Sequence, residues 1–341
     1  MSLSSVTIVG AGLAGLATAE AALQEGLSVT LLEAKKPGAG ASGAATGLLH
    51  PFPGLRALVP WQGIPAFLSA AEHLERYAQQ DPKILFTRGV WRPALPSQEQ
   101  DYRRAAERAE ADGRVLAQWR EDGPPATLPQ GLVCGAGLWI PQGFVVDVPR
   151  YLHFWSEDLR KRGVQFVQRS WEEGLTPGIT ILATGPAIGK RLGCELVRGQ
   201  SLCVQPPPGT TLPCGIAGRA YLAPEAQGWW VGGTFEHGDD REQPEPKEAV
   251  RLLLPRVVEM WPGEHHPLTW PILAARAGLR VSAPGHLPVI GHWQGNLWVY
   301  TGLGSKGLLY HLWGAKLLMR SIVHGEPLPV EVGMERLVGR V

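Results

Sequence analysis

The chain has 341 residues, with 32 lysines and arginines against 31 aspartates and glutamates, so its formal charge is +1. This balance excludes the strongly basic field of a dedicated nucleic-acid binder, and a content of 44% hydrophobic and 18% charged residues excludes a disordered chain. The length allows one large domain or two interlocked domains, which bury enough apolar surface to fold without a disulfide or a metal.

The first predicted elements form a β-turn-α-β unit, with a strand at 6–9, a helix at 13–24 and a strand at 28–33. Gly10, Gly12 and Gly15 lie between the first strand and the helix in the spacing G-x-G-x-x-G. Such glycines permit a tight turn and the close approach of a pyrophosphate, which the helix N-terminus attracts. Glu33, 18 residues after Gly15, ends the second strand, where a carboxylate accepts both ribose hydroxyls. The unit predicts a dinucleotide, either NAD or FAD.

After residue 37 the chain alternates between predicted helices and strands, with no internal repeat. We expect helices at 63–80, 102–121, 151–162, 246–260 and 307–323. We expect strands at 83–95 around Gly89, in a hairpin at 138–148, at 165–168 and 179–183 in the first sheet, and at 198–205, 221–223, 229–235 and 297–301. Shifts in composition predict two domains threaded through each other, a nucleotide domain of 1–80, 140–197 and 284–341 and a substrate domain of 81–139 and 198–283.

A second glycine-rich turn, with Gly302, Gly304 and Gly307, also lies between a predicted strand and a predicted helix. Only 34 residues follow Gly307, too few for a second nucleotide-binding unit. We therefore expect a helix N-terminus whose N–H groups face a ligand that becomes anionic, such as a reduced flavin ring. The alternative is a plain strand-to-helix turn.

These glycine-rich segments, together with Gly40-Ala41-Ser42-Gly43 and Ala183-Thr184-Gly185, form an ordered set typical of one enzyme family. Over essentially its whole length the chain resembles the D-amino-acid oxidase family of FAD enzymes. Its segments GASGAATGLLHP and GLGSKGL are most similar to the FAD-dependent half of MnmC, the bifunctional enzyme that completes a wobble-uridine modification in tRNA, and to stand-alone plant and cyanobacterial relatives of that half. Glycine and sarcosine oxidases are slightly less similar. The resemblance implies an α/β fold of the glutathione-reductase-like type, with a Rossmann-like FAD-binding domain and an interleaved antiparallel-sheet substrate domain.

The resemblance also implies how FAD is held. The loop at 40–43 would cover the flavin diphosphate and ring, with Ser42 and Thr46 as hydrogen-bond donors, unless it is an exposed linker. Residues 183–185 would close the ribose side, or Thr184 would cap the next turn. Family members with covalent flavin use a cysteine beside the ring, and none lies within 302–307, so we expect non-covalent FAD. The implied cofactor residues are Gly10, Gly12, Leu13, Ala14, Gly15, Glu33, Ala34, Gly40, Ala41, Ser42, Thr46, Gly47, Leu48, Ala183, Thr184, Gly185, Gly302, Gly304, Ser305, Lys306, Gly307 and Leu308.

Four residues are candidates for substrate binding and catalysis. The resemblance to glycine oxidase and MnmC-like enzymes places the planar fork of Arg280 on the substrate carboxylate, with Tyr221 in support. Val281 replaces the proline that follows this arginine in glycine oxidases, so the local turn departs from the family pattern. Lys306 would lie beside the flavin and stabilise its anionic reduced form, and His50 would line the substrate cavity. The alternatives are an interdomain salt bridge for Arg280, a half-buried strand position for Tyr221, a solvated Lys306 and a structural His50.

The implied activity is oxidation of the C–N bond of an amino acid or N-substituted glycine. A hydride passes to flavin, water hydrolyses the resulting imine, and oxygen reoxidises the flavin with release of hydrogen peroxide. One alternative is MnmC-like removal of a carboxymethyl group from the wobble uridine of tRNA, which needs a basic rim that the net charge does not indicate. Another alternative is a flavin-binding protein without catalysis.

Neither a metal site nor a membrane anchor is expected. Glu264-His265-His266 lacks the HExxH spacing and a clear third ligand, and no apolar run is as long as the ~18 residues of a membrane span. The start of the chain has no basic leader. The cysteines lack zinc-ligand spacing and predict reduced thiols in a cytoplasmic protein. They are Cys134, Cys194, Cys203 and Cys214.

Overall fold

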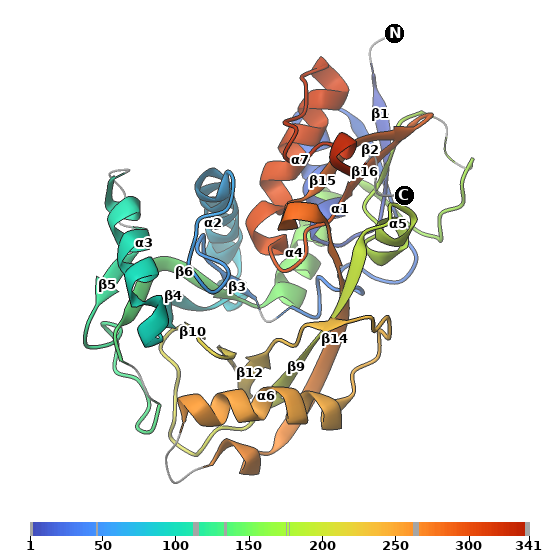
Figure 1. Cartoon of the computed structure of the whole chain (residues 1–341). Coiled ribbons are helices and arrows are strands. Elements are labelled where there is room, and N and C mark those ends of the chain that lie inside the picture. Colours follow the sequence, from blue (N-terminus) through green and yellow to red (C-terminus); the bar gives the residue numbers. More distant parts are fainter. Residues whose placement is uncertain are drawn as a thin grey trace.

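Two β-sheets organise the chain in the computed structural model, which describes residues 3–45, 47–111, 116–132, 135–174, 176, 178–261 and 266–337. Thr46, Cys134 and the Glu264-His265 pair, all named above, lie outside the described residues. In Figure 1 the first sheet and most helices form the upper part of the molecule, and the second sheet with helix α6 forms the lower part.

The first sheet is mostly parallel, in the strand order β15-β16-β8-β1-β2-β7. Its strands are β1 (Ser5–Val9), β2 (Ser28–Glu33), β7 (Gln165–Gln168), β8 (Thr180–Leu182), β16 (Leu297–Thr301) and the antiparallel edge strand β15 (Val289–Gln294). Val6, Ile8 and Leu31 are buried, as aliphatic side chains of a parallel sheet normally are. The return of β7 and β8 to the sheet opened by β1 and β2 confirms that prediction.

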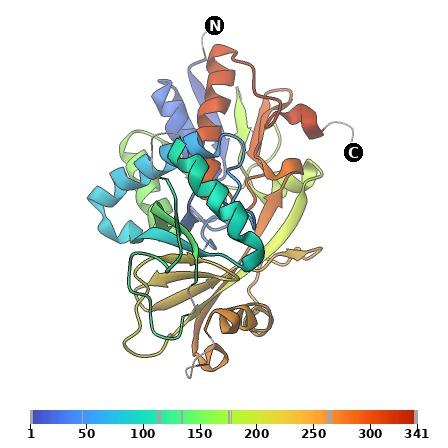
Figure 2. The ribbon, with the colours of Figure 1, turned by 60° about the vertical axis from the view of Figure 1, so that its left-hand side comes forward.

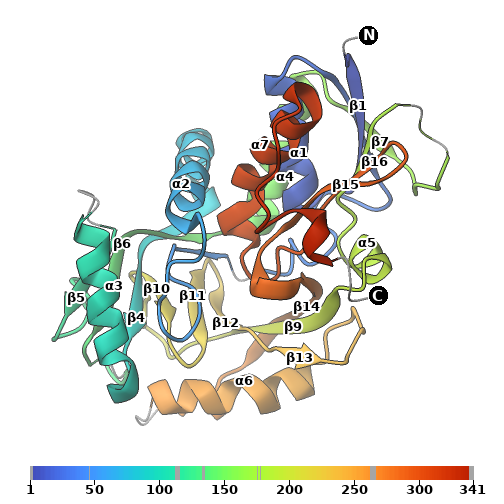
Figure 3. The ribbon, with the colours of Figure 1, turned by 45° about the horizontal axis from the view of Figure 1, so that its top comes forward.

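Helices pack tightly beside this sheet. Helix α1 (Leu13–Gln24) contacts α4 (Val148–Lys161) and α7 (Gly307–His324), and α2 (Gly63–Gln80) contacts α7. Figure 3 shows α1, α4 and α7 side by side. The short helix α5 (Pro186–Arg191) follows β8. Among the described residues, none of the helices combines the length and the apolar character that crossing a membrane requires.

The second sheet has the strand order β13-β9-β12-β11-β10-β4-β6-β3, with β14 paired to β9 and β5 paired to β6. Its strands are β3 (Leu48–Leu49), β4 (Leu85–Pro93), β5 (Gln118–Arg120), β6 (Gly137–Val146), β9 (Glu195–Val204), β10 (Gly215–Ala217), β11 (Tyr221–Glu225), β12 (Gly228–Gly232), β13 (Glu236–His237) and β14 (Ile272–Ser282). Helix α6 (Pro246–Met260), which has the predicted bounds, covers one face through a cluster that includes Leu222 and Leu253. The other face is turned toward the first sheet (Figure 2).

Two predicted elements near the edge of the second sheet were wrong. The helix predicted at 102–121 is α3 (Glu99–Ala111), and Trp119 belongs to strand β5 instead. Figures 1 and 3 show α3 beside β5. Trp119 pairs with Leu138 of β6, a partner distant in sequence that a local charge pattern does not reveal. Short 3₁₀ turns occur at Pro82–Ile84, Pro96–Gln98, Pro267–Thr269, Pro284–His286 and Met334–Leu337.

The hairpin predicted at 138–148 is also wrong, because β6 is a single strand and α4 begins directly after it. Pro141-Gln142-Gly143 resembles a turn, but β6 continues through it, with an irregularity in its pairing opposite Gly89 of β4. Gly143 is needed there for packing, since a Cβ at that position would lie 2.7 Å from Cγ2 of Val90. Gly89 similarly lies inside β4, with φ +87° and the Trp139 ring in the space of its missing side chain.

A buried carboxylate joins three helices of the upper part. Glu20 of α1 is 2% exposed and accepts hydrogen bonds from Arg76 (3.0 Å), Arg162 (3.0 Å) and Trp155 (2.6 Å). Nε2 of His73 lies 3.3 Å from the same carboxylate. Burial raises the pKa of Glu20, but His73 and the other donors outweigh burial and hold this pKa well below its usual value of 4.5.

We predict that Glu20→Gln lowers the free energy of unfolding by about 2–4 kcal/mol, because it leaves partly buried arginines without their carboxylate. The pKa of Glu20 is lower in the folded than in the unfolded chain. Its contribution is therefore present above the usual value and is lost as the pH falls through the folded value. Urea unfolding at pH 7 and at pH 4 measures both effects, and the difference between wild type and variant should narrow at pH 4. Glu157→Gln, which breaks an exposed ion pair with Arg160 on α4, is the control and should change stability by less than about 0.5 kcal/mol.

Candidate functional site

The first glycine turn places the N-terminus of α1 directly after β1. Gly10 has φ +101°, and its N–H donates to the Leu32 carbonyl at 2.8 Å. A Cβ at Gly15 would overlap the Gly10 carbonyl, and a Cβ at Gly12 would lie 2.9 Å from Oγ of Ser42. The three glycines therefore allow the turn, the helix and the loop at 40–43 to lie against one another, as the fingerprint predicts.

Two predicted polar residues hold this turn. Oε2 of Glu33 accepts from the N–H of Ala11 at 2.8 Å, and its Oε1 accepts from the N–H of Lys35 at 2.9 Å. Oγ of Ser42 accepts from the N–H of Leu13 at 3.1 Å. The loop at 40–43 thus lies on the first turn of α1, although Ala34 and Gly40 within this region are exposed.

Other predicted cofactor residues lie next to strand β8 of the first sheet and strand β3 of the second. Ala183 follows β8, its N–H donates to Val9 at 2.9 Å, and a Cβ at Gly10 would lie 2.5 Å from its carbonyl oxygen. The Thr184 carbonyl accepts from Ala187, and Gly185 is the residue before α5. Gly47 and Leu48 lead into β3, where the Gly47 carbonyl accepts from Val146 at 2.8 Å.

The second glycine turn meets the first. Gly302 and Gly304 have φ +73° and +52°, and the N–H of Gly304 donates to Val281 at 2.9 Å. Helix α7 then begins at Gly307, where a Cβ would lie 3.1 Å from Cδ1 of Leu13 at the start of α1. Of its neighbours, Leu308 is buried and Ser305 is exposed. The N-termini of two helices therefore converge on one place.

These features fit an FAD molecule. The first turn would receive the diphosphate, Glu33 lies at the end of β2, and α7 directs its first N–H groups to the same region. Oγ1 of Thr301, at the end of β16, is buried and has no hydrogen-bond partner among the described residues, so it can accept or donate a bond there.

Arg280 and Tyr221 lie on the face of the second sheet that is turned toward this region. Nη1 of Arg280 donates to the Thr234 carbonyl at 2.8 Å, and its guanidinium lies 4.6 Å from the centre of the Phe235 ring. A side chain at Gly199 would overlap that guanidinium. Burial lowers the pKa of Arg280, while Tyr221 and then Glu236 act in the opposite direction, which places Tyr221 in its electrostatic neighbourhood. Sequence reasoning missed Phe235, which is 50% exposed and stacks on the arginine without any motif around it.

Lys306 and His50 have contacts of their own. Nζ of Lys306 donates to the His286 carbonyl at 2.6 Å, and burial lowers the pKa of this amine. Nδ1 of His50 accepts from the N–H of Phe52 at 3.3 Å. Burial, and then the charge of Arg92, lower the pKa of His50 to about 3, so this imidazole is neutral at pH 7.

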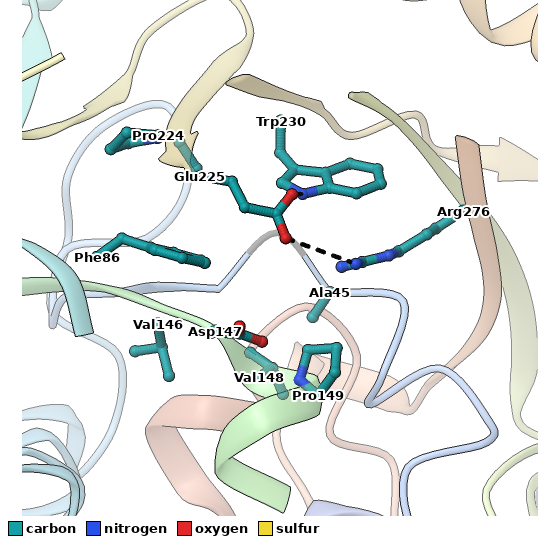
Figure 4. Close-up of a pocket in the computed structure, with 11 residues that line it drawn as sticks. Ala45, Phe86, Val146, Asp147, Val148, Pro149, Pro224, Glu225, Trp230 and Arg276 are labelled. Atoms are coloured by element: carbon teal, nitrogen blue, oxygen red, sulfur yellow. Dashed lines mark hydrogen bonds and ion pairs between the residues drawn. The ribbon is translucent and has the colours of Figure 1, made fainter. Parts of the chain in front are cut away.

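A small pocket lies between Ala45, which follows the loop at 40–43, and the second sheet (Figure 4). Ala45 faces Trp230, Glu225 and Arg276 across it. Nε1 of Trp230 donates to Glu225, and the Arg276 guanidinium lies 4.0 Å from the centre of the Trp230 ring and 3.9 Å from the Glu225 carboxylate. Glu225 therefore links Trp230 and Arg276 on the side of the pocket opposite Ala45.

Comparisons with known proteins identify the family and the fold of this chain. A family model described as DAO, FAD dependent oxidoreductase, matches residues 5–320. The tRNA 5-methylaminomethyl-2-thiouridine biosynthesis bifunctional protein MnmC of Polaromonas naphthalenivorans is 28% identical over an alignment that covers 95% of this chain, but only 57% of that protein. Glycine oxidase from Geobacillus kaustophilus superimposes with a TM-score of 0.81 at 19% identity, covering 99% of this chain and 100% of that one. L-proline dehydrogenase from P. horikoshii gives 0.79 at 16% identity, with 98% of both chains covered. The predicted resemblance and fold class are thereby confirmed.

We predict that Gly15→Ala weakens FAD binding about tenfold or more, because the new Cβ overlaps the Gly10 carbonyl and the resulting shift costs about 1–3 kcal/mol. Titration of the apoprotein with FAD, followed by flavin fluorescence, measures the dissociation constant. The matched control is Gly135→Ala, at a position where no atom lies within 4 Å of the added Cβ, and its affinity should equal that of the wild type. Equal affinities for both variants would contradict the role assigned to the turn.

Proposed function

The chain belongs to the DAO family of FAD-dependent oxidoreductases, and within it we propose that this protein oxidises the C–N bond of an amino acid or an N-substituted glycine. The observation that carries the proposal is that the Arg280 guanidinium lies against Gly233, the residue after the strand partner of Tyr221, on the cofactor-facing side of the second sheet. A guanidinium there is suited to hold the carboxylate that such substrates share.

The surroundings of Arg280 support binding of an anion. Its guanidinium lies close against the backbone of Gly199 and Gly233, where side chains would collide with it. Phe235 covers the guanidinium on one side, and the Thr234 carbonyl fixes its orientation through Nη1. An arginine that is partly removed from water and held in one orientation binds a carboxylate with little further loss of side-chain entropy.

FAD, when bound, supplies the acceptor for a hydride from the carbon next to nitrogen. The C–H bond breaks, both its electrons leave with the hydride, and the nitrogen lone pair forms the C=N bond of an imine that water hydrolyses. This chain would contribute the carboxylate clamp and the N–H groups of α7, which favour negative charge near their helix end. Lys306 would add a positive charge there. We propose that FAD is held without a covalent bond and that oxygen accepts the electrons.

We predict that Arg280→Lys lowers kcat/KM for carboxylate-bearing amines about 10- to 150-fold, because a point charge replaces a planar fork at a charged hydrogen bond. Tyr221→Phe should cost about 2- to 10-fold, as expected for a neutral hydrogen bond. Anaerobic mixing with glycine, sarcosine, proline and D-alanine, followed by loss of the flavin visible band, measures both effects.

Arg219→Lys serves as the control for these variants, since Arg219 is 53% exposed and pairs with Glu259 of α6. An unchanged kcat/KM in Arg280→Lys would remove Arg280 from the site. If a wide panel of amines leaves the flavin of the wild type oxidised, the alternative of a flavin-binding protein without catalysis is favoured instead.

A second candidate function is removal of a carboxymethyl group from modified uridine in tRNA, with release of glyoxylate. The observation in its favour is the 28% identity with an MnmC protein over 95% of this chain. The same carboxylate clamp would serve, because the group removed is an N-carboxymethyl. The formal charge of +1 argues against it, since RNA binding draws on a basic surface.

We predict that tRNA does not shift the mobility of this protein in a gel at either low or high salt. Phosphate contacts make RNA binding salt-dependent, so a shift at about 50 mM salt that disappears at about 200 mM would indicate RNA contact. Such a shift together with glyoxylate release from carboxymethyl-bearing tRNA would establish the second candidate over the first.

A further inference from the structure

Arg92 of β4 is a buried arginine that makes no ion pair with any acidic residue that the structure describes. It is 5% exposed, and its Nη2 donates to the Gly54 carbonyl (2.5 Å) and to the Tyr102 hydroxyl (2.8 Å). Its Nε and Nη1 are buried and have no hydrogen-bond partner within the described part of the chain. The contrast is Arg198, whose Nη1 lies 2.8 Å, 3.1 Å and 3.5 Å from three carboxylates. Burying a guanidinium costs folding free energy unless a negatively charged group accepts hydrogen bonds from its N–H groups.

The strand register places Arg92 on the same face as Tyr221. Trp91 belongs to the cluster under α6, so its neighbour Arg92 points to the opposite, cofactor-facing side. Ala217 pairs with Tyr221, and the preceding residue of β10 pairs with Trp91 in parallel, which puts Arg92 level with Ala217. Tyr221 and Arg92 therefore lie in one row across β11, β10 and β4. Their main chains are separated by two strand spacings, about 10 Å.

His50 supplies a second donor from the loop that Arg92 holds, since it stands four residues before Gly54, whose carbonyl accepts from Nη2 of Arg92. The charge of Arg92 acts on this imidazole, which is neutral at pH 7. Its Nδ1 accepts from Phe52, so its proton is on Nε2. This end of the row therefore presents hydrogen-bond donors and a positive charge, which together suit an anion.

We propose that Arg92 and His50 bind a second acidic group of the substrate, so that the amine oxidised by this chain carries two carboxylates. One carboxylate would be held by Arg280 and Tyr221 and the other by Arg92, with the reacting C–N bond between them. The inference rests on the proposed function and specifies its substrate class. Two observations carry the inference. Arg92 has buried N–H groups without a hydrogen-bond partner among the described residues, and it lies in the same row of the sheet as Tyr221.

The test compares N-(carboxyalkyl)glycines that have one, two or three methylenes before the second carboxylate with their monoamides, which have the same length and lack that charge. For at least one length, wild-type kcat/KM in anaerobic flavin reduction should be about 10- to 100-fold higher for the diacid. Arg92→Gln should reduce this ratio toward one. The matched control is Arg88→Gln on the same strand, where the guanidinium is 59% exposed and pairs with Glu75, and it should keep the wild-type ratio.

A binding measurement completes the test. Calorimetry of the FAD-loaded protein should show that glutarate or adipate binds more tightly than butyrate. The Arg92→Gln variant should bind the dicarboxylates and butyrate with similar affinity. If Arg92→Gln does not fold, the wild-type ratio and the wild-type preference for the diacid still decide. Equal turnover of diacid and monoamide overturns this inference and leaves the proposed function intact. If no amine reduces the flavin, the proposed function fails, and the dicarboxylate affinities then decide the Arg92 site alone.

Discussion

The close approach of backbone at Gly10 and Gly15 is the constraint on which the cofactor region depends. Without it α1 could not begin directly against β1, and its N–H groups would point elsewhere. The strands β1, β8 and β16 are parallel neighbours, so their ends at Val9, Leu182 and Thr301 lie at one edge of the sheet. Three glycine-containing segments that are distant in sequence thereby reach one site, as expected for the carboxyl edge of a parallel sheet.

The second sheet separates two kinds of arginine by its alternation of faces. Arg198 points to the side of α6 and meets three carboxylates, so its charge is neutralised within the protein. Arg280 and Arg92 point to the cofactor side and contact backbone carbonyls and aromatic rings instead. The formal charge of +1 conceals this separation, because it averages two faces with opposite roles. A local excess of positive charge is what a site for a small acidic molecule requires.

The sequence predicts what depends on neighbouring residues. Helix α6 has its predicted bounds because a proline in its first turn and an apolar period mark it locally. Pro141-Gln142-Gly143 was wrongly predicted as a turn, because Gly143 is there to make room for Val90 of β4, a strand distant in sequence. The sequence did not predict Arg92 and Phe235 as site residues for the same reason, since their positions follow from strand order and not from a motif. The domain boundaries and the individual site residues stay predictions.

Backbone contact sets the distance between the strand that carries Arg280 and the loop that lies on α1. Gly278 lies two residues before Arg280 on β14, and a Cβ there would be 2.7 Å from Cα of Ala41 in the loop that lies on α1. No side chain of Gly278 intervenes at this contact, so rotamer changes there cannot separate the strand that carries Arg280 from the loop on α1. Hydride transfer depends on placement within about 1 Å. In the proposed site Gly278 would therefore matter as much as Arg280, because it sets this spacing although it offers no chemical group.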